Sequence, residues 1–144
     1  EYLDSRHYYG YDLCDNRITE AKQEVAIYHA QHKLPVLTSD WSDIDRQFKY
    51  IWSHQVLIHI SDELLPLTIS CIKSALQCDG LALITVNTAT EKWPDGSEWL
   101  EYPFVARSLD FYKEQFGKYG MNVELCEDSV ASNGQTSIRV KHAS

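Results

Sequence analysis

Short apolar or β-branched runs alternate with longer helical stretches along the chain, an order typical of α/β proteins built from strand-helix-strand units. The runs that predict strands lie at residues 7–13, 35–39, 50–55, 81–87, 121–126 and 137–142. The stretches that predict helices lie at about 15–32, 61–77 and 108–119. No repeat, low-complexity tract or Pro/Gly-rich linker divides the chain, so we expect a single domain over residues 1–144.

The predicted helices have recognisable starts and ends. Asp15 and Ser61 offer N-caps, Ser108 is expected to start the third helix, and Gly80 and Gly120 are expected to end the second and third helices. The apolar positions of the first helix are Ile18, Ala21, Val25 and Tyr28. Those of the second are Leu64, Leu65, Ile69, Ile72 and Leu76. Pro66 lies beyond the first helical position, so we expect either a loose first turn or a regular helix that begins one turn later.

The connections predict how the strands pair. Strands joined by a helix must run parallel, whereas the Asn133-Gly134 step between the last two strands is a strong signal for an antiparallel hairpin. Residues 81–87 form the most apolar strand, which suits a central position with both faces covered. The pattern therefore predicts an α/β fold with a mostly parallel sheet, an antiparallel C-terminal hairpin and flanking helices. Residues 88–106 are expected to form a long irregular loop.

Composition and charge exclude several classes of function. Among the 144 residues, 13 basic and 21 acidic side chains give a net charge of −8, and no stretch gathers the basic residues, so nucleic acid is not an expected partner. No apolar run approaches the roughly 20 residues that span a bilayer, and the first residues lack a signal-peptide pattern. We therefore expect no membrane partner and a cytoplasmic location, with the four cysteines as free thiols.

One candidate binding residue follows directly from the strand pattern. Asp12 ends the first predicted strand, directly before a predicted helix, and a carboxylate at such a strand tip can accept both hydroxyls of a ribose. A turn or capping carboxylate is the competing interpretation of Asp12. His29 and His32 lie at helical spacing without further ligands nearby in the sequence, so we expect no metal site.

Three local patterns, together with the order of elements, resemble the class I S-adenosylmethionine-dependent methyltransferases. The segment YYGYDL, residues 8–13, is similar to the second-strand motif of that family. The segment YIWSHQVLIHI, residues 50–60, is similar to the fourth strand and the turn after it, and LQCDGLALITV, residues 76–86, is similar to the turn into the fifth strand. The resemblance covers nearly the whole chain and implies a Rossmann-like methyltransferase fold.

The resemblance also implies roles for particular residues toward S-adenosylmethionine. It puts Asp12 on the ribose hydroxyls, Leu13 near the adenine, Asp40 facing the adenine amino group and Trp41 beside it as an apolar wall. The backbone around Ser53 and His54 would line the methionine half of the cofactor. A competing interpretation of Asp40 is a solvated cap before Asp43 and Asp45.

No catalytic residue is assigned, because methyl transfer from a sulfonium is a direct displacement that depends mainly on proximity and alignment. If an acid or base takes part, His54, Gln55 and His59 are the residues near the expected mouth of the site. In the family the stretch equivalent to residues 88–106 commonly contributes to the acceptor pocket. Trp93, Trp99 and Tyr102 are therefore candidate contacts to a small-molecule acceptor, or else the packed interior or partner surface of that loop.

The chain departs from the family pattern at its start. The family has a first strand, a glycine-rich turn and a helix before the segment that opens this chain, and the six glycines here form no G-x-G step. We therefore expect an N-terminally incomplete domain, whose exposed sheet edges could pair in a homodimer.

Three hypotheses follow. The first is methyl transfer from S-adenosylmethionine to a small molecule. The second is a non-catalytic remnant of the same fold that serves as a binding or oligomerisation module. The third is a fragment of a nicotinamide-binding domain, against which the terminal hairpin argues.

Overall fold

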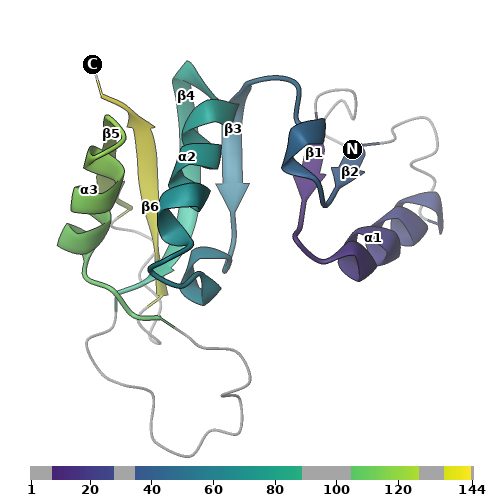
Figure 1. Ribbon diagram of the computed structural model, residues 1–144, viewed down its shortest axis with the longest axis horizontal. Helices are drawn as coiled ribbons and strands as arrows, with labels where there is room; N and C mark the ends of the chain where they lie inside the picture. Colours follow the sequence, from purple (N-terminus) through teal and green to yellow (C-terminus); the bar gives the residue numbers. More distant parts are fainter. Residues whose placement is uncertain (1–7, 28–34, 89–104, 127–134, 144) are drawn as a thin grey trace, which may run out of the picture. The chain divides into compact units, whose positions relative to one another are not determined.

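A computed structural model of the chain describes residues 8–27, 35–88, 105–126 and 135–143 (Figure 1). The chain divides into two compact units, Glu1–Arg46 and Gln47–Ser144. Within the described residues, no helix is both long and apolar enough to cross a membrane. The single domain over residues 1–144 stays a prediction.

The first unit is a small strand-helix-strand motif. Its elements are β1 (Tyr9–Tyr11), α1 (Asp15–Ile27), β2 (Val36–Thr38) and the 3-10 turn η3 (Trp41–Asp43). β1 and β2 pair in parallel, with Gly10 opposite Leu37, as expected for strands that a helix connects. Ile18 of α1 is buried, and Ala21 and Val25 are half-buried, which confirms three positions of the predicted apolar stripe. Tyr28 lies outside the described residues.

The second unit carries a four-stranded sheet and two helices. Its elements are β3 (Phe48–Ser53), the 3-10 turn η4 (Leu57–His59), α2 (Leu65–Ala75), β4 (Leu76–Asn87), α3 (Leu109–Gly117), β5 (Met121–Leu125) and β6 (Gln135–His142). The strand order is β3-β4-β6-β5. β3 pairs with β4 in parallel, whereas β6 pairs antiparallel with both β4 and β5. The predicted antiparallel hairpin is confirmed, although Asn133 and Gly134 lie outside the described residues.

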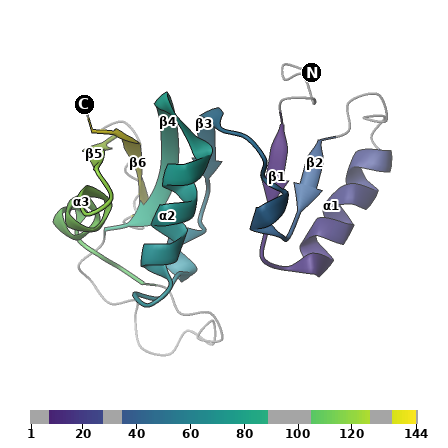
Figure 2. The same cartoon turned by 45° about the horizontal axis from the view of Figure 1, so that its top comes forward.

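The core of this unit lies between one face of the sheet and its two helices. α2 and α3 both cover this face (Figure 2). The fully buried side chains on it include Ile69, Ala82, Ile84, Tyr112, Phe116, Ile138 and Val140. On the opposite face, Tyr50 and Trp52 of β3 are each 72% exposed. Ile51, which lies between them in the strand, packs against the core. Because side chains of a β-strand alternate between its faces, Tyr50 and Trp52 project away from the core.

Pro66 was expected to give either a loose first turn or a helix that begins one turn later, and α2 begins one turn later. Ser61 does not cap a regular helix; its carbonyl instead accepts hydrogen bonds from the N–H groups of Leu64 (3.2 Å) and Leu65 (3.0 Å). The regular helix then begins at Leu65, which leaves Pro66 in the first turn, where its missing N–H costs nothing. The prediction that Leu64 belongs to the buried face is wrong, since it lies before the helix and is 51% exposed.

The predicted role of Gly80 as the end of this helix is also wrong. α2 ends at Ala75 and β4 begins at Leu76, so residues 76–80 are strand rather than helix. A Cβ on Gly80 would lie 2.9 Å from the carbonyl oxygen of Gln77 and 2.8 Å from Cδ1 of Leu76. Gly80 therefore permits a close backbone approach at a position where the local sequence suggested a helix end.

Candidate functional site

In the first unit, both candidate acids follow the carboxyl ends of neighbouring parallel strands. Asp12 comes directly after β1, and Asp40 comes two residues after β2. The N–H of Asp12 donates to the carbonyl of Thr38 at 3.3 Å, which ties the ends of the two strands together. In α/β sheets, ligands bind outside the carboxyl ends of the strands, so this edge is a candidate binding site.

The Asp12 carboxylate also stabilises the turn into α1. Its Oδ1 accepts a hydrogen bond from the backbone N–H of Cys14 at 2.8 Å. This is the turn or capping role that competes with a ribose contact in the interpretation of Asp12. This is its one hydrogen bond among the described residues, and the side chain is exposed. An ionised carboxylate has about four acceptor positions, so the cap leaves room for a ligand. The two interpretations of Asp12 are compatible.

The Asp40 carboxylate likewise caps a turn and could also accept hydrogen bonds from a ligand. Its Oδ1 accepts from the backbone N–H of Ser42 at 2.8 Å and caps η3. Hydrogen bonds from the Ser42 side chain and backbone hold the pKa of Asp40 below its ordinary value of 3.8. At neutral pH Asp40 is therefore a carboxylate that accepts hydrogen bonds. Its backbone N–H donates to Oγ1 of the buried Thr38 at 3.0 Å, which fixes the residue relative to β2.

Aromatic and apolar groups lie at the same edge. The rings of Tyr11 and Trp41 meet edge to face, with centroids 4.9 Å apart; Tyr11 is exposed and Trp41 is half-buried. Leu13 follows Asp12 and is 72% exposed. The structure thus brings Asp12, Leu13, Asp40 and Trp41 together around the ends of β1 and β2.

In the second unit, Ser53, His54 and Gln55 lie where β3 ends. The predicted strand reached residue 55, but β3 ends at Ser53, so His54 and Gln55 follow the strand. Nδ1 of His54 is 3.2 Å from Oγ1 of Thr85, on the neighbouring strand β4. The Trp52 and His54 rings are tilted by 32° with centroids 5.7 Å apart. His54 is exposed, and its contact with Thr85 holds one ring nitrogen.

Gln55 adopts a conformation that few non-glycine residues take. Its φ is 57°, in the left-handed region, and its Nε2 donates to Oε1 of Gln135 at 3.3 Å. Such strained residues concentrate at functional sites and persist only where the surroundings determine the backbone. His59, the last residue of η4, is exposed and four positions further along the chain.

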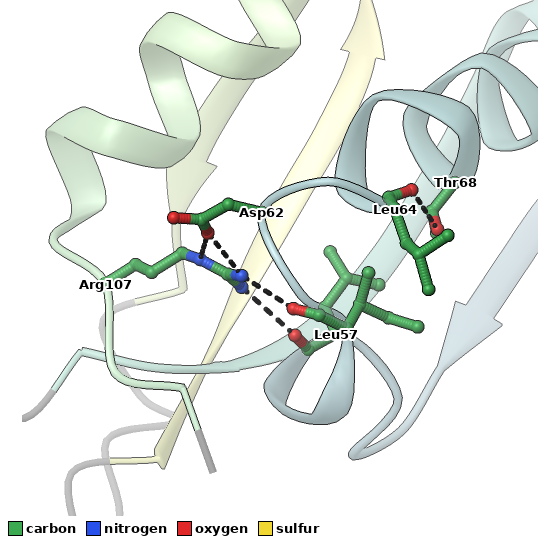
Figure 3. Close-up of polar contacts among 6 residues, drawn as sticks. Leu57, Asp62, Leu64, Thr68 and Arg107 are labelled. Atoms are coloured by element: carbon green, nitrogen blue, oxygen red, sulfur yellow. Dashed lines mark hydrogen bonds and ion pairs between the residues drawn. The ribbon is translucent and has the colours of Figure 1, made fainter. Parts of the chain in front are cut away.

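Arg107, whose burial the sequence pattern does not predict, connects this region to the end of β4. The side chain of Arg107 is 4% exposed, and its guanidinium contacts Asp62 and the carbonyls of Leu57 and Ile60 (Figure 3). In the sequence Arg107 lies between the predicted loop of residues 88–106 and the helix that starts at Ser108, where an exposed charge is the ordinary expectation. No local signal identifies it as buried.

The remaining candidates lie outside the described residues. Trp93, Trp99 and Tyr102 fall within residues 89–104, as do most positions of the predicted acceptor loop, and His29 and His32 fall within 28–34. In the part of the chain that the structure describes, no three His, Cys, Asp or Glu side chains gather closely enough to hold a metal ion.

No protein-family profile and no curated protein sequence matches this chain. Several solved structures do. The magnesium protoporphyrin IX methyltransferase from Synechocystis PCC 6803 with bound S-adenosylmethionine is 16% identical, with a TM-score of 0.66; the match covers 94% of this chain and 59% of that one. An S-adenosylmethionine-dependent methyltransferase from Clostridium acetobutylicum ATCC 824 is 14% identical, with a TM-score of 0.71, and the match covers 94% and 75%. A mitomycin 7-O-methyltransferase is 14% identical, with a TM-score of 0.71 and coverage of 94% and 41%.

At these identities the likeness shows the fold alone. The chain has the Rossmann-like fold of the class I S-adenosylmethionine-dependent methyltransferases, as the resemblance of its motifs implied. It spans only 59%, 63% and 65% of the length of three of the similar chains.

Proposed function

We propose that the chain binds S-adenosylmethionine at the carboxyl ends of its parallel strands and takes part in methyl transfer to a small-molecule acceptor. The observation that carries this proposal is the pair of acids, Asp12 and Asp40, that follow adjacent parallel strands of this fold. An ionised carboxylate at the first strand end suits the ribose hydroxyls, and one at the second suits an exocyclic amino group.

The other residues of this edge suit the rest of the nucleoside. Leu13 and Trp41 provide apolar surface for an adenine ring. In the second unit, Ser53 ends β3 and His54 follows it; these two are the residues that the family resemblance implies for the methionine half. Gln55 and His59 come next in the chain as candidate acceptor contacts. Methyl transfer by direct displacement requires these groups to hold and align the reactants, with no catalytic acid or base assigned.

Calorimetry with S-adenosylmethionine and S-adenosylhomocysteine tests the proposal. We expect both to bind the wild-type chain, and Asp12→Asn to weaken binding by about 10-fold or more, since a charged hydrogen-bond acceptor is lost. Asn retains a carbonyl oxygen for the Cys14 N–H, so the turn into α1 should be preserved. Glu20→Gln is the matched control, because it removes one charge from an exposed ion pair with Arg17 on α1. No binding by the wild-type chain would overturn the proposal.

A specific observation favours a second candidate function, a binding or oligomerisation module. β3 is a terminal strand of its four-stranded sheet and exposes Tyr50 and Trp52, a combination that favours association with another chain. A homodimer through this region would be detected by analytical ultracentrifugation. We expect Trp52→Glu to abolish such a dimer, whereas the exposed Leu67→Glu on α2 should leave it unchanged.

A further inference from the structure

The connection after β3 is fixed at both of its ends. On one side, the parallel pairing of Ser53 with Ile84 holds the end of β3 against β4. On the other side, the turn of residues 57–62 is held by the buried guanidinium of Arg107 (Figure 3). Only three residues, 54–56, link these two points, and they include His54 and the left-handed Gln55.

Arg107 contacts this turn through every nitrogen of its guanidinium. Nε donates to Oδ1 of Asp62 at 2.8 Å, and Nη2 lies 2.6 Å from the same atom. Nη2 also donates to the carbonyl of Ile60 at 2.6 Å, and Nη1 donates to that of Leu57 at 3.3 Å. A planar guanidinium can satisfy these directions together, whereas a lysine ammonium cannot.

The backbone beside Arg107 anchors the same region to β4. The N–H of Arg107 donates to the carbonyl of Asn87, the last residue of β4, at 3.0 Å. The N–H of Val105 donates to the carbonyl of Ile58 at 2.8 Å. One short segment therefore joins the end of β4, the turn after β3 and, through the Ser108 cap, the start of α3.

We propose that Arg107 is a positioning residue for the cofactor site: it fixes the turn of residues 57–62 against the end of β4 and thereby sets the backbone of residues 53–55. This inference rests on the proposed function of those residues. The left-handed backbone of Gln55 is consistent with it, because such a conformation persists only where the surrounding structure determines the backbone. A misplacement of about 1 Å in a binding site costs up to about 100-fold in rate.

The test compares Arg107→Met with Ile72→Ala, a cavity-forming change in α2 that leaves the contacts of Arg107 intact. Both variants are measured below their melting transitions, so that loss of folded protein does not contribute. We expect Arg107→Met to weaken S-adenosylhomocysteine binding by about 10-fold or more, and Ile72→Ala to leave it within about twofold. Asp62→Asn keeps an acceptor oxygen for Arg107 and should retain most of the affinity.

Amide hydrogen exchange in the ligand-free chain provides the second readout. The N–H groups of His59, Ile60 and Val105 should exchange at least about tenfold faster in Arg107→Met than in Ile72→Ala. Faster exchange with unchanged affinity would overturn the positioning role, as would exchange equal to that of the control. If the wild-type chain binds no S-adenosylhomocysteine, the proposed function fails, and with it this role at a cofactor site.

Discussion

The ring of Tyr11, at the end of β1, meets the ring of Trp41, at the start of η3, edge to face with centroids 4.9 Å apart. The two residues are 30 positions apart in the sequence, yet they join the ends of two neighbouring strands at the proposed nucleoside edge. Edge-to-face aromatic pairs stabilise a fold beyond the area that they bury. This contact is therefore expected to maintain the geometry around Asp12 and Asp40.

A double-mutant cycle of Tyr11→Leu and Trp41→Leu measures this contact. We expect a coupling energy of about 0.5–1.5 kcal/mol in the free energy of unfolding, determined by urea denaturation followed by far-UV circular dichroism. Tyr8→Leu combined with Trp41→Leu is the control, because Tyr8 is exposed and precedes β1, whereas Tyr11 ends that strand. Strict additivity of the Tyr11 and Trp41 changes would contradict a stabilising contact.

Two glycines near the end of α3 should respond differently to substitution by alanine. Gly120 has a φ of +68°, which an L-residue adopts at a cost, so Gly120→Ala should lower the free energy of unfolding by about 1 kcal/mol. Gly117 ends the helix, and a Cβ added there would meet nothing within 4 Å, so Gly117→Ala should leave stability unchanged or raise it by up to about 1 kcal/mol. Urea denaturation of both variants checks the contrast; equal effects would argue against the left-handed conformation of Gly120.

Tyr112→Phe is expected to stabilise the second unit. The Tyr112 hydroxyl is buried and interacts with the Arg107 guanidinium, but no group among the described residues meets the geometry of a hydrogen bond to it. Because an unsatisfied buried hydroxyl costs free energy, its removal should raise the free energy of unfolding by about 1 kcal/mol at neutral pH. Thermal and urea denaturation measure the change. Tyr119→Phe is the control, because Tyr119 packs against the same core but is only partly buried.

The same variant has an expected pH dependence. Burial raises the pKa of Tyr112 above its ordinary value of 10.0, although the Arg107 guanidinium opposes the rise. A raised pKa in the folded state means that the unfolded chain loses this proton first, so wild-type stability is full below pH 10.0 and declines as the pH rises above it. Tyr112→Phe lacks this contribution, so its stability advantage should widen above about pH 10. A constant advantage across this range would contradict the raised pKa.

The elements that local sequence specifies were predicted well. Ser108 caps α3, with its side chain accepting from the N–H of Phe111, because a hydroxyl before a helical stretch meets this need locally. Gly120 follows the end of α3, and the last two strands pair antiparallel. The antiparallel final strand also counts against a fragment of a nicotinamide-binding domain.

The misplaced elements depend on contacts distant in sequence. Leu76 continues the apolar stripe of the predicted helix, but it pairs with Phe48 of β3 and is fully buried there, so strand replaces helix from this residue on. The burial of Arg107 likewise depends on acceptors that lie 45 to 50 positions earlier in the chain. Neither outcome can be read from a local window, because the partners become neighbours only on folding.

The sequence by itself determined that Asp12 and Asp40 each follow a strand, because the preferences for strands, turns and caps act over a few residues. It also determined the order of strands and helices that this fold requires. Only the tertiary structure decided that these two acids share one edge, since that depends on the parallel pairing of β1 with β2. It also decided that Arg107 is buried against the turn after β3, because the desolvation of a charge is offset only where its partners meet in space.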